Sequence, residues 1–567
     1  MTDSVSSTTS STSSASTTTR TSYSQNRNEF DSEALAEEGY QAKLAKADSL
    51  ETEVSDNETT IAAYQDMQSL LQTMQDTLEN LRGDPSSSGQ SSDVFLNRTA
   101  YLTSSTSTDA DSLMAATVED GTDIGSHDVE ITQVAKAERL GGSSQSSKTE
   151  DLGLSGDFTL GTTLDGTSSS ATITITSDMS LGDIVDTIND ESDNTGVSAS
   201  VIQVSSDEYM LVLTAADTAA SIDLEDSSGG VLQSLGVLDS SGDKADVLQE
   251  AQTAQLTIDG VAIERSSNTI DDALDGVTLT LYKAEEGNTL TLEVASSLTD
   301  IKEQVQALVD TYNSFRDFVI TNQSTGDDGS ADTEAVLFGD STLRSVSRAM
   351  QTALSTSVDG VSLADAGLSL DSDNKLVLDE DTLDDALLND FDAIEKLFRY
   401  SAETSSGSLS LLSHGDGPSS AEFTMDITVG SDGSLSSVSV DGDSSLFTVS
   451  GARIVGAEGS DYEGLTFVYT GTTTQSIDVT LSQGIADQLW QTADDAADDD
   501  EGQLASLISS LEDTNSDLED RISTIQTNAE TYREYLLDKY SSIEAKLSEA
   551  QSTLDLLEAM TNAESDD

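Results

Sequence analysis

The stretch "SSNTIDDALDGVTLTL", Ser266 to Leu281, has the alternating pattern of a β-strand and lies near the middle of the chain. In its second half apolar residues alternate with threonines, so one face of a sheet would receive the apolar side chains. These are Val277, Leu279 and Leu281. The Asp275-Gly276 pair just before them favours a tight turn. We therefore predict a strand that the chain enters through this turn.

The segment directly upstream predicts a β-hairpin. In "AQLTIDGVAIERSS" two alternating runs flank Asp259-Gly260, a pair that fits a two-residue turn between strands. Leu256 and Ile258 would share one face of the first strand. We expect the strand of the opening stretch to be a further strand of the same sheet.

Segments on both sides of this region add strands and helices. Upstream, "SHDVEITQVAKAERL" predicts a strand, and the next segment predicts a strand, a helix with Ser180 as its N-cap, and two more strands. Downstream, Leu298 to Thr321 and "DSTLRSVSRAMQTALST" have the spacing of amphipathic helices. A hairpin around Asp373-Asn374, one or two helices and a β-rich segment from about Glu422 to Leu481 follow.

Both ends of the chain have helical spacing. From Phe30 to Arg82 apolar residues recur mostly at three- and four-residue steps, and Gly83 and Pro85 end the pattern. Near the C-terminus the steps alternate between four and three over several heptads, which is the seam of a coiled coil. The seam positions are Leu504, Ile508, Leu511, Asn515, Leu518, Ile522, Ile525, Leu536, Ile543, Leu547, Leu554 and Leu557.

The seam admits more than one interpretation. A single amphipathic helix packed on a globular domain would share its spacing, although such helices rarely keep a seam so long. If it is a coiled coil, its apolar residues either pair the two terminal helices within one subunit or face other molecules, and both can hold at different heights. Asn515 lies in the seam and is expected to set the register at some cost in stability.

These patterns together predict an α+β multidomain chain. Its terminal helices would form an α-helical coiled coil, beside a mixed helical domain and inserted β-rich domains. The expected divisions are a disordered Ser/Thr-rich tail at 1–29, N-terminal coil helices at 30–82, a linker at 83–99, a β-rich domain at 100–142 plus 246–297, an inserted β-rich domain with one helix at 143–245, a helical and mixed domain at 298–400, a β-rich segment at 401–495, a C-terminal coiled-coil helix at 496–562 and a tail at 563–567.

The composition is strongly acidic, with 106 Asp and Glu against 24 Lys and Arg and a formal net charge of −82. Such charge disfavours nucleic acid or an anionic membrane as a partner. It suggests either disorder or adaptation to concentrated salt, and the regular hydrophobic repeats favour a folded protein adapted to salt. No stretch reaches the roughly 20 apolar residues of a membrane span, and the N-terminus lacks the apolar core of a secretory signal peptide. The chain contains no cysteine.

In order along the chain, several blocks resemble one family. They include "SLGDIVDTINDESDNTGVSASVI", "AQLTIDGVAIERSSNTIDDALDGVTLTLY", "IKEQVQALVDTYNSF", "LADAGLSLDSDNKLVLDEDTLDDAL" and "YEGLTFVYTG". This series is similar to the flagellar filament cap family, flagellar hook-associated protein 2, from about Phe30 to Met560. The chain departs from the family at its N-terminus, where a Ser/Thr tail precedes the diverged "EFDSEALAEEGYQAKLAKADSLE".

The resemblance implies a structural function in the bacterial flagellum. Members are expected to leave the cell through the flagellar type III export apparatus, without a cleaved signal peptide and with a chaperone. Outside the cell they would form a homo-oligomeric ring, a pentamer or similar, at the distal filament tip and promote flagellin polymerisation. The implied partners are other copies of the chain, flagellin and hook-associated proteins, with no insertion into a membrane.

No residue pattern indicates an enzyme, a cofactor or a metal site. Among so many carboxylates some pair will stand at glycosidase spacing by chance. His127 and His414 lie far apart in polar stretches, so we expect both at the surface. The stretch "DSDNKLVLDEDT", Asp371 to Thr382, has Lys375, Leu376 and Thr382 where a calcium-binding EF-hand loop needs an oxygen ligand, Gly and Glu, and is predicted to be a polar hairpin turn.

Two other functions compete with the filament cap. Another flagellar axial protein, such as a flagellin or a hook–filament junction protein, would share the terminal coils but not the "SSNTIDDALDGVTLTL" block followed by "VDTYNSF". A surface adhesin would use the β-rich domains to bind glycans or cells, and its binding would survive loss of both terminal coils.

Overall fold

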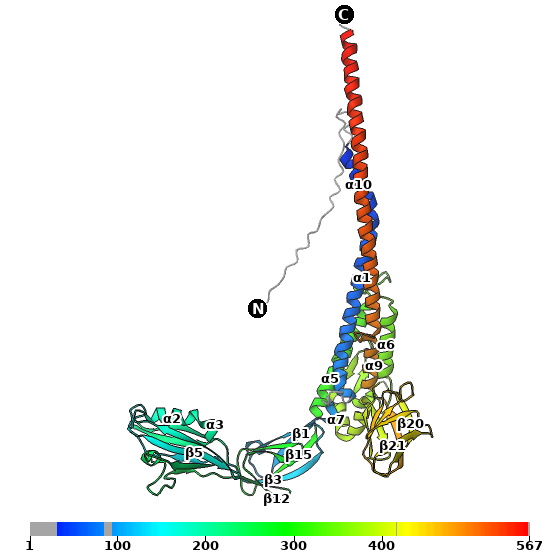
Figure 1. Ribbon diagram of the computed structural model, residues 1–567. Helices are drawn as coiled ribbons and strands as arrows, with labels where there is room; N and C mark the ends of the chain where they lie inside the picture. The colour runs from blue at the N-terminus through cyan, green and yellow to red at the C-terminus, as the bar shows by residue number, and fades with distance from the viewer. Residues whose placement is uncertain (1–30, 84–92, 416, 565–567) are drawn as a thin grey trace. The chain divides into compact units, whose positions relative to one another are not determined.

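The computed structural model describes residues 31–83, 93–415 and 417–564 (Figure 1). The described chain divides into two units. The first holds residues up to Gln68, the segment Thr333–Phe338 and residues from Asp499 onward, and the second holds Ser69–Asp332 and Gly339–Asp498. The predicted tail at 1–29, residues 84–92 of the predicted linker and the last three residues of the C-terminal tail lie outside the described residues. The architecture is α+β and multidomain, as the sequence predicts.

The first unit consists mainly of two long helices that run side by side (Figure 1). α1 spans Ser32–Arg82, so its last turns belong to the second unit, and α10 spans Gln503–Glu564. The predicted terminal helices are therefore confirmed. Neither helix has a strong apolar face of its own over its whole length, so tertiary pairing, rather than intrinsic propensity, must stabilise them.

The stretch Ser266 to Leu281 lies in a β-rich domain with two sheets. The five-stranded sheet has the order β1-β15-β3-β11-β12 and the three-stranded sheet has the order β13-β14-β2, and both contribute to one core. The strands are β1 (Arg98–Ser104), β2 (Met114–Val118), β3 (Gly125–Gln133), β11 (Ala254–Ile258), β12 (Val261–Arg265), β13 (Thr269–Leu274), β14 (Val277–Leu281) and β15 (Thr289–Ser296), with short 3-10 helices at Val94–Leu96 and Ala110–Ser112.

The hairpin predicted at Asp259-Gly260 is confirmed, because β11 pairs antiparallel with β12 on either side of this turn. The prediction that the opening stretch continues the same sheet is wrong, since β14 pairs with β13 and β2 in the second sheet. The change of sheet falls at Asn268, between β12 and β13. Its side-chain amide donates to the Ala135 carbonyl and accepts from the Ala135 N–H, at 3.0 and 2.7 Å, which anchors this connection to the segment after β3.

The inserted module contains two sheets and short helices around a second core. The sheet orders are β10-β4-β8-β7 and β6-β5-β9. Ser180 caps the main helix of the module as predicted, with its hydroxyl accepting from Asp183 N and the Asp183 carboxylate accepting in return. The elements are β4 (Arg139–Gly141), β5 (Gly156–Leu164), β6 (Thr167–Ile175), α2 (Leu181–Asp190), α3 (Ser192–Thr195), β7 (Val197–Ser205), β8 (Glu208–Ala215), β9 (Ser221–Asp226), α4 (Val231–Ser234) and β10 (Val247–Gln249).

The mixed helical domain follows, and the two predicted amphipathic helices appear as its first elements. The predicted hairpin turn is also present, and the buried helix α5 holds its tip, because Tyr312 Oη donates to the Asn374 carbonyl and Arg316 Nε donates to the Asp373 carbonyl, at 3.2 and 2.9 Å. The elements are α5 (Leu298–Asn322), α6 (Ser341–Leu354), a 3-10 helix (Leu363–Ala366), β16 (Leu368–Leu370), β17 (Leu376–Leu378), α7 (Glu380–Asn389), α8 (Phe391–Phe398) and α9 (Ile485–Ala497).

A β-sandwich is inserted between α8 and α9. Its two four-stranded sheets, β18-β25-β20-β21 and β19-β24-β23-β22, share one apolar core. Helix α9 begins at Ile485, within the segment 401–495 that was predicted to be β-rich, and ends at Ala497, so the β structure ends earlier than expected, at Ser482. The strands are β18 (Ser401–Thr404), β19 (Leu409–Ser413), β20 (Ser420–Val429), β21 (Leu435–Val440), β22 (Phe447–Ser450), β23 (Arg453–Gly456), β24 (Thr466–Tyr469) and β25 (Gln475–Ser482).

The substitution Leu279→Ala tests the core of the first β-rich domain. Leu279 is fully buried, so truncation should leave a cavity and destabilise the domain by about 2 to 5 kcal/mol. Hydrogen exchange of the β14 amides measures this loss locally. Val261→Ala is the control, because Val261 is 65% exposed and its truncation should change stability by less than about 0.5 kcal/mol. Equal protection of β14 in both variants would contradict the assignment of this core.

Candidate assembly seam and its supporting contacts

The first unit pairs α1 with α10 in an antiparallel arrangement. Three polar contacts at different heights show the direction, because positions rise along α1 as they fall along α10. Ser32 Oγ donates to Glu544, Arg533 donates to Glu37, and Asn57 Nδ2 donates to Asn515 Oδ1, at 2.8, 2.9 and 2.8 Å. The terminal helices therefore pair within one subunit over this length.

The predicted seam residues fall into three groups, buried, half-buried and exposed. Six are buried, Leu504, Ile508, Asn515, Leu518, Ile522 and Leu536, and two are half-buried, Leu511 and Ile525. Small residues on α1 allow the close approach, since a Cβ at Gly39 would come within 2.4 Å of Leu536 Cδ1. The buried part of the seam ends before residue 541, because every residue of α10 from there to residue 561 is exposed.

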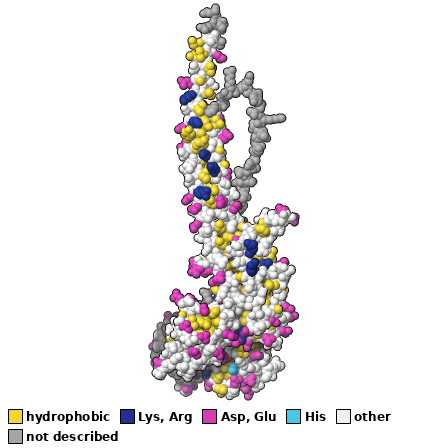
Figure 2. Space-filling view, turned by 90° about the vertical axis from the view of Figure 1, so that its right-hand side faces the viewer, with side chains coloured by type: hydrophobic (Ala, Val, Ile, Leu, Met, Phe, Trp, Pro, Cys, Tyr) yellow, Lys and Arg dark blue, Asp and Glu magenta, His cyan; other side chains and the backbone are white. Residues whose placement is uncertain are grey.

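Four seam residues are exposed, namely Ile543, Leu547, Leu554 and Leu557, with exposed fractions between 37% and 62%. Leu556 and Met560 add to this apolar surface, which we call the α10 tip, residues 543–560. In Figure 2 hydrophobic side chains gather along the far part of this helix. In the described part of the chain, α1 begins at Ser32 beside Glu544, so no described helix covers the α10 tip.

Asn515 lies at a buried seam position opposite Asn57 of α1. The two side-chain amides are joined by this hydrogen bond, and a shift of the helices by one heptad would break it and place each amide against other seam residues. Unpaired polar groups in such a place cost more free energy than the hydrogen bond contributes when it is made. This arrangement is the geometry that a register-setting residue requires.

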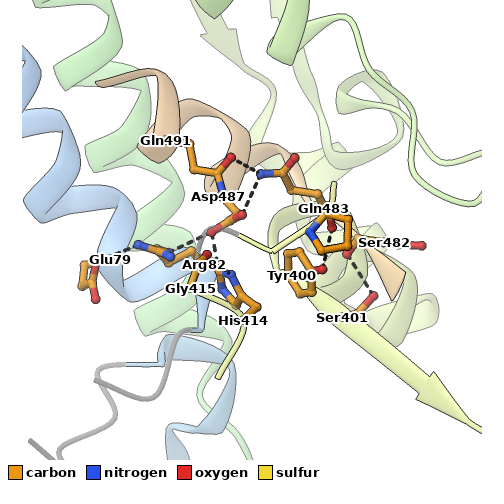
Figure 3. Close-up of polar contacts among 11 residues, drawn as sticks. Glu79, Arg82, Tyr400, Ser401, His414, Gly415, Ser482, Gln483, Asp487 and Gln491 are labelled. Carbon is orange, nitrogen blue, oxygen red and sulfur yellow. Dashed lines mark hydrogen bonds and ion pairs between the residues drawn. The ribbon is translucent and has the colours of Figure 1, made fainter. Parts of the chain in front are cut away.

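The second unit contains a buried ion pair at the end of α1 (Figure 3). Arg82 Nε lies 2.9 Å from Asp487 Oδ1 of α9, and the Asp487 side chain is fully buried. The Arg82 guanidinium also lies over the Trp490 ring, 3.8 Å from its centroid, in a cation–π contact. Glu79, one turn earlier in α1, lies 3.6 Å from the same guanidinium.

Gln483 contacts the Asp487 carboxylate, and Gln491 in turn contacts Gln483 (Figure 3). Gln483 Nε2 donates to Asp487 Oδ2 and to Gln491 Oε1, both at 2.8 Å. The three residues recur at four-residue steps, so they lie on one face of the segment that enters α9. Hydrogen bonds from neutral partners lower the cost of burying this charge.

His414, from the β-sandwich, lies at the same site. The prediction that it lies at the surface is wrong. It is only 2% exposed, and it stacks on Tyr400 with ring centroids 4.1 Å apart. Its Nδ1 donates to the Gly415 carbonyl at 3.0 Å, and its Nε2 lies 3.5 Å from Asp487 Oδ1. Burial raises the pKa of the Tyr400 hydroxyl, and the Asp487 carboxylate raises it further.

A second buried acid lies nearby in the same unit. Asp93 caps the first 3-10 helix by accepting from Phe95 N, and its carboxylate lies 2.9 Å from Arg399 Nη2. Burial raises the pKa of Asp93, and the Arg399 charge opposes this shift. The buried ion pairs thus join the end of α1, the helical domain and the base of the sandwich within one unit.

His127 and the stretch Asp371 to Thr382, the other candidates considered from the sequence, take part in contacts that stabilise turns and strands. His127 is partly exposed and its Nδ1 lies 2.8 Å from Asp259, and this hydrogen bond lowers the pKa of the Asp259 carboxyl. Asp371 accepts from Asp373 N and Lys375 N, as in a polar hairpin turn. Residues 31–83, 93–415 and 417–564 contain no cluster of three or more His, Asp or Glu that could hold a metal ion. In the same ranges no helix is long and apolar enough to cross a membrane.

The Arg82–Asp487 site was not predicted from the sequence. A signal was available in "SQGIADQLWQTAD", where polar residues recur every four positions beside the only tryptophan of the chain. The sequence could not show that Arg82 is the partner of Asp487, because the two residues are far apart in the sequence and only the folded chain brings them together.

Family comparisons match most of the chain. The model described as flagellar hook-associated protein 2 C-terminus matches residues 251–552, the model described as flagellar hook-associated protein 2 N-terminus matches residues 28–138, and the flagellin hook IN motif matches residues 157–217. Together they follow the order of blocks on which the resemblance was based.

Similar proteins carry the same description. The flagellar hook-associated protein 2 of Escherichia coli (strain K12) is 31% identical over 323 residues, which is 54% of this chain and 68% of that protein. The A-type flagellar hook-associated protein 2 of Pseudomonas aeruginosa is 25% identical over 250 residues, 40% of this chain and 52% of that protein. The crystal structure of the D1-D2-D3 domains of the flagellar cap protein FliD from Escherichia coli has a TM-score of 0.44 at 30% identity and covers 59% of this chain and 89% of that chain.

The substitution Asp487→Ala tests the buried ion pair. It removes the carboxylate that faces Arg82 inside the fold, so we expect a loss of about 3 to 5 kcal/mol in the unfolding free energy of this unit. Fluorescence of Trp490, the only tryptophan, reports directly on the site during denaturant unfolding.

The matched control is Asp384→Ala in the same domain. Asp384 pairs with Lys302 at 2.7 Å but its side chain is 45% exposed, so its removal should cost less than about 1 kcal/mol. A loss for Asp487→Ala no larger than that of the control would show that the buried pair contributes little.

Proposed function

The chain belongs to the flagellar hook-associated protein 2 family and functions in capping the flagellar filament, and we propose that it does so as a ring of identical subunits that guides flagellin into the filament. The observation that supports the ring is the α10 tip, where the coiled-coil seam continues without a described partner. The proposal assigns no catalytic role to any residue. The family matches do not favour the two alternatives, a surface adhesin or another flagellar axial protein.

The proposal assigns different tasks to the two parts of the seam. The seam residues from Leu504 to Leu536 are buried or half-buried and hold the terminal helices of one subunit together. The α10 tip keeps the same four-three spacing, but among the described residues its apolar side chains are exposed. Exposing apolar surface to water is unfavourable by roughly 25 cal/mol per Å². We propose that neighbouring subunits and flagellin cover the tip in the assembled cap.

The electrostatics of a ring depend on salt. Every subunit contributes a net charge of −82, so subunits repel one another unless the charge is screened. We propose that the acidic surface is an adaptation to concentrated salt, in which the Debye length falls to about 3 Å at 1 M. Apolar contacts at the tip can then act at short range.

We also propose the export route that the family implies. The chain would reach the filament tip outside the cell through the flagellar type III apparatus, with a chaperone and without a cleaved signal peptide. The absence of cysteine in the sequence is compatible with this route.

The double substitution Leu554→Asp with Leu557→Asp tests assembly through the α10 tip. Two charges in a buried helical contact lack partners, so oligomers should be lost while each subunit stays folded. Light scattering in about 2 M salt gives the absolute mass, and circular dichroism gives the helix content.

Two controls separate charge from burial in that experiment. Ser541→Asp with Ser548→Asp adds the same charge on a face of α10 that carries neither the seam nor Leu556 and Met560, and should leave the oligomer intact. Leu518→Asp with Ile522→Asp alters the buried part of the seam and should lower the helix content as well as the mass. Oligomers of normal mass from the tip variant would exclude the tip as the subunit contact.

The second test concerns salt. The purified chain should lose compactness and helix content below about 0.5 M salt and regain both above it, because self-repulsion between acidic side chains is screened only at higher ionic strength. Circular dichroism and small-angle scattering over a salt series measure the change. A signal that stays constant across the series would refute adaptation to salt.

A further inference from the structure

Strand β7 forms one edge of the four-stranded sheet β10-β4-β8-β7 in the inserted module. It is nine residues long and pairs with β8 along one side only. An edge strand presents backbone N–H and C=O groups to any strand that approaches, so proteins usually protect such edges with charges, bulges or covering segments.

Side chains protect only the first half of the β7 edge, and the β7–β8 register is irregular between Gln203 and Ser205 at its far end. The N–H and C=O of Ala199 bond to the side-chain amide of Asn189, at 2.7 and 3.0 Å, and Thr195 Oγ1 accepts from Val197 N. Because groups on one edge of an antiparallel strand recur every second residue, the same edge next presents the backbone of Val201 and Gln203. Among the described residues neither has a backbone partner on this side.

The outer face of the sheet beside this edge is apolar. Ile202 and Val204 on β7 are 50% and 53% exposed. Met210 of β8 lies directly opposite Ile202 in the β7–β8 register, so it adjoins them on this face. We call this surface the β7 edge patch, namely Ile202, Val204 and Met210.

The open edge is also free of charge. Residues 194–206 contain no Asp, Glu, Lys or Arg, in a chain with 106 acidic and 24 basic residues. The charges that commonly keep edge strands apart are therefore missing where the backbone is open. Any partner strand must likewise be uncharged, since an acidic strand would be repelled by the rest of the surface.

We propose that β7 is a self-association site, at which two copies of the chain pair their β7 strands antiparallel about a two-fold axis at Ile202. The strand is complementary to itself in this register. Val201 of one copy would face Gln203 of the other, so both open residues on each strand gain backbone partners, and Ile202 would meet Ile202 of the second copy. The two sheets would form one continuous sheet with the apolar patches on the same face.

The absence of cysteine makes a direct test possible. In the proposed register Ile202 faces its own copy in a non-hydrogen-bonded pair, with Cα atoms about 4.5 Å apart, which lies within the range of roughly 4.4 to 6.8 Å that a disulfide needs. The full-length Ile202→Cys variant, oxidised in about 2 M salt, should become a disulfide-linked dimer of doubled mass. Non-reducing electrophoresis measures this directly.

Two exposed positions provide controls for random collision. Val204→Cys and Val261→Cys are at least as exposed as Ile202 but lie off the proposed axis, so each alone should stay largely monomeric under the same oxidation. Equal dimer yields from all three variants would overturn the proposal. All three sites are on the surface, so a failure to fold does not explain a negative result.

A mixed pair tests the register itself. Ser200 would face Val204 of the second copy, whereas two copies of either residue would be about 13 Å apart, four residues of strand length. Mixing isotope-labelled Ser200→Cys with unlabelled Val204→Cys should therefore give the mixed disulfide in excess of both homodimers. A statistical mixture of the three products would contradict pairing in this register, even if the Ile202→Cys dimer forms.

Discussion

The antiparallel pairing of α1 with α10 is the constraint on which the rest of the chain depends. It joins Asn57 to Asn515 across 458 positions of sequence, so everything between the two helices is an insertion held at both ends. The entropy cost of closing such a loop grows only with the logarithm of its length, which lets whole β domains lie inside it. Apolar seam residues would tolerate a shift by a heptad, and the polar contacts are what select one alignment.

Charge then limits where the molecule can touch another one. With a net charge of −82, most of its surface repels a second copy or any acidic protein. The α10 tip and the β7 edge are two surfaces where contact with another molecule is still possible, for different reasons. The α10 tip combines acidic residues with a row of exposed leucines, so it needs screening before it can associate, whereas the β7 edge has no charge within residues 194–206 and needs less.

The sequence predicted elements better than it predicted their partners. Periodicity located α1, α5, α6 and α10 and the hairpin at Asp259-Gly260, because side-chain spacing reports directly on local geometry. It failed where tertiary contacts decide. The opening stretch lies in a second sheet, which the chain enters past Asn268, and a histidine from a polar stretch lies buried against Tyr400. The spacing of α10 shows the seam over its full length. The buried part of the seam ends where α1 begins, and the sequence of α10 carries no information about that position.

The symmetry of the two proposed contacts determines how they can coexist. A ring closes through contacts in which one surface of a subunit meets a different surface of the next, and such contacts follow a rotation around the ring axis. Pairing of β7 with itself is two-fold, and after one pair has formed its edge is used up. The β7 contact therefore cannot propagate around a ring. It can only join subunits in pairs, so if both contacts form on one chain, the β7 pair would connect two rings or two opposed subunits, and its strength would set how readily caps associate with each other without altering the number of subunits in each.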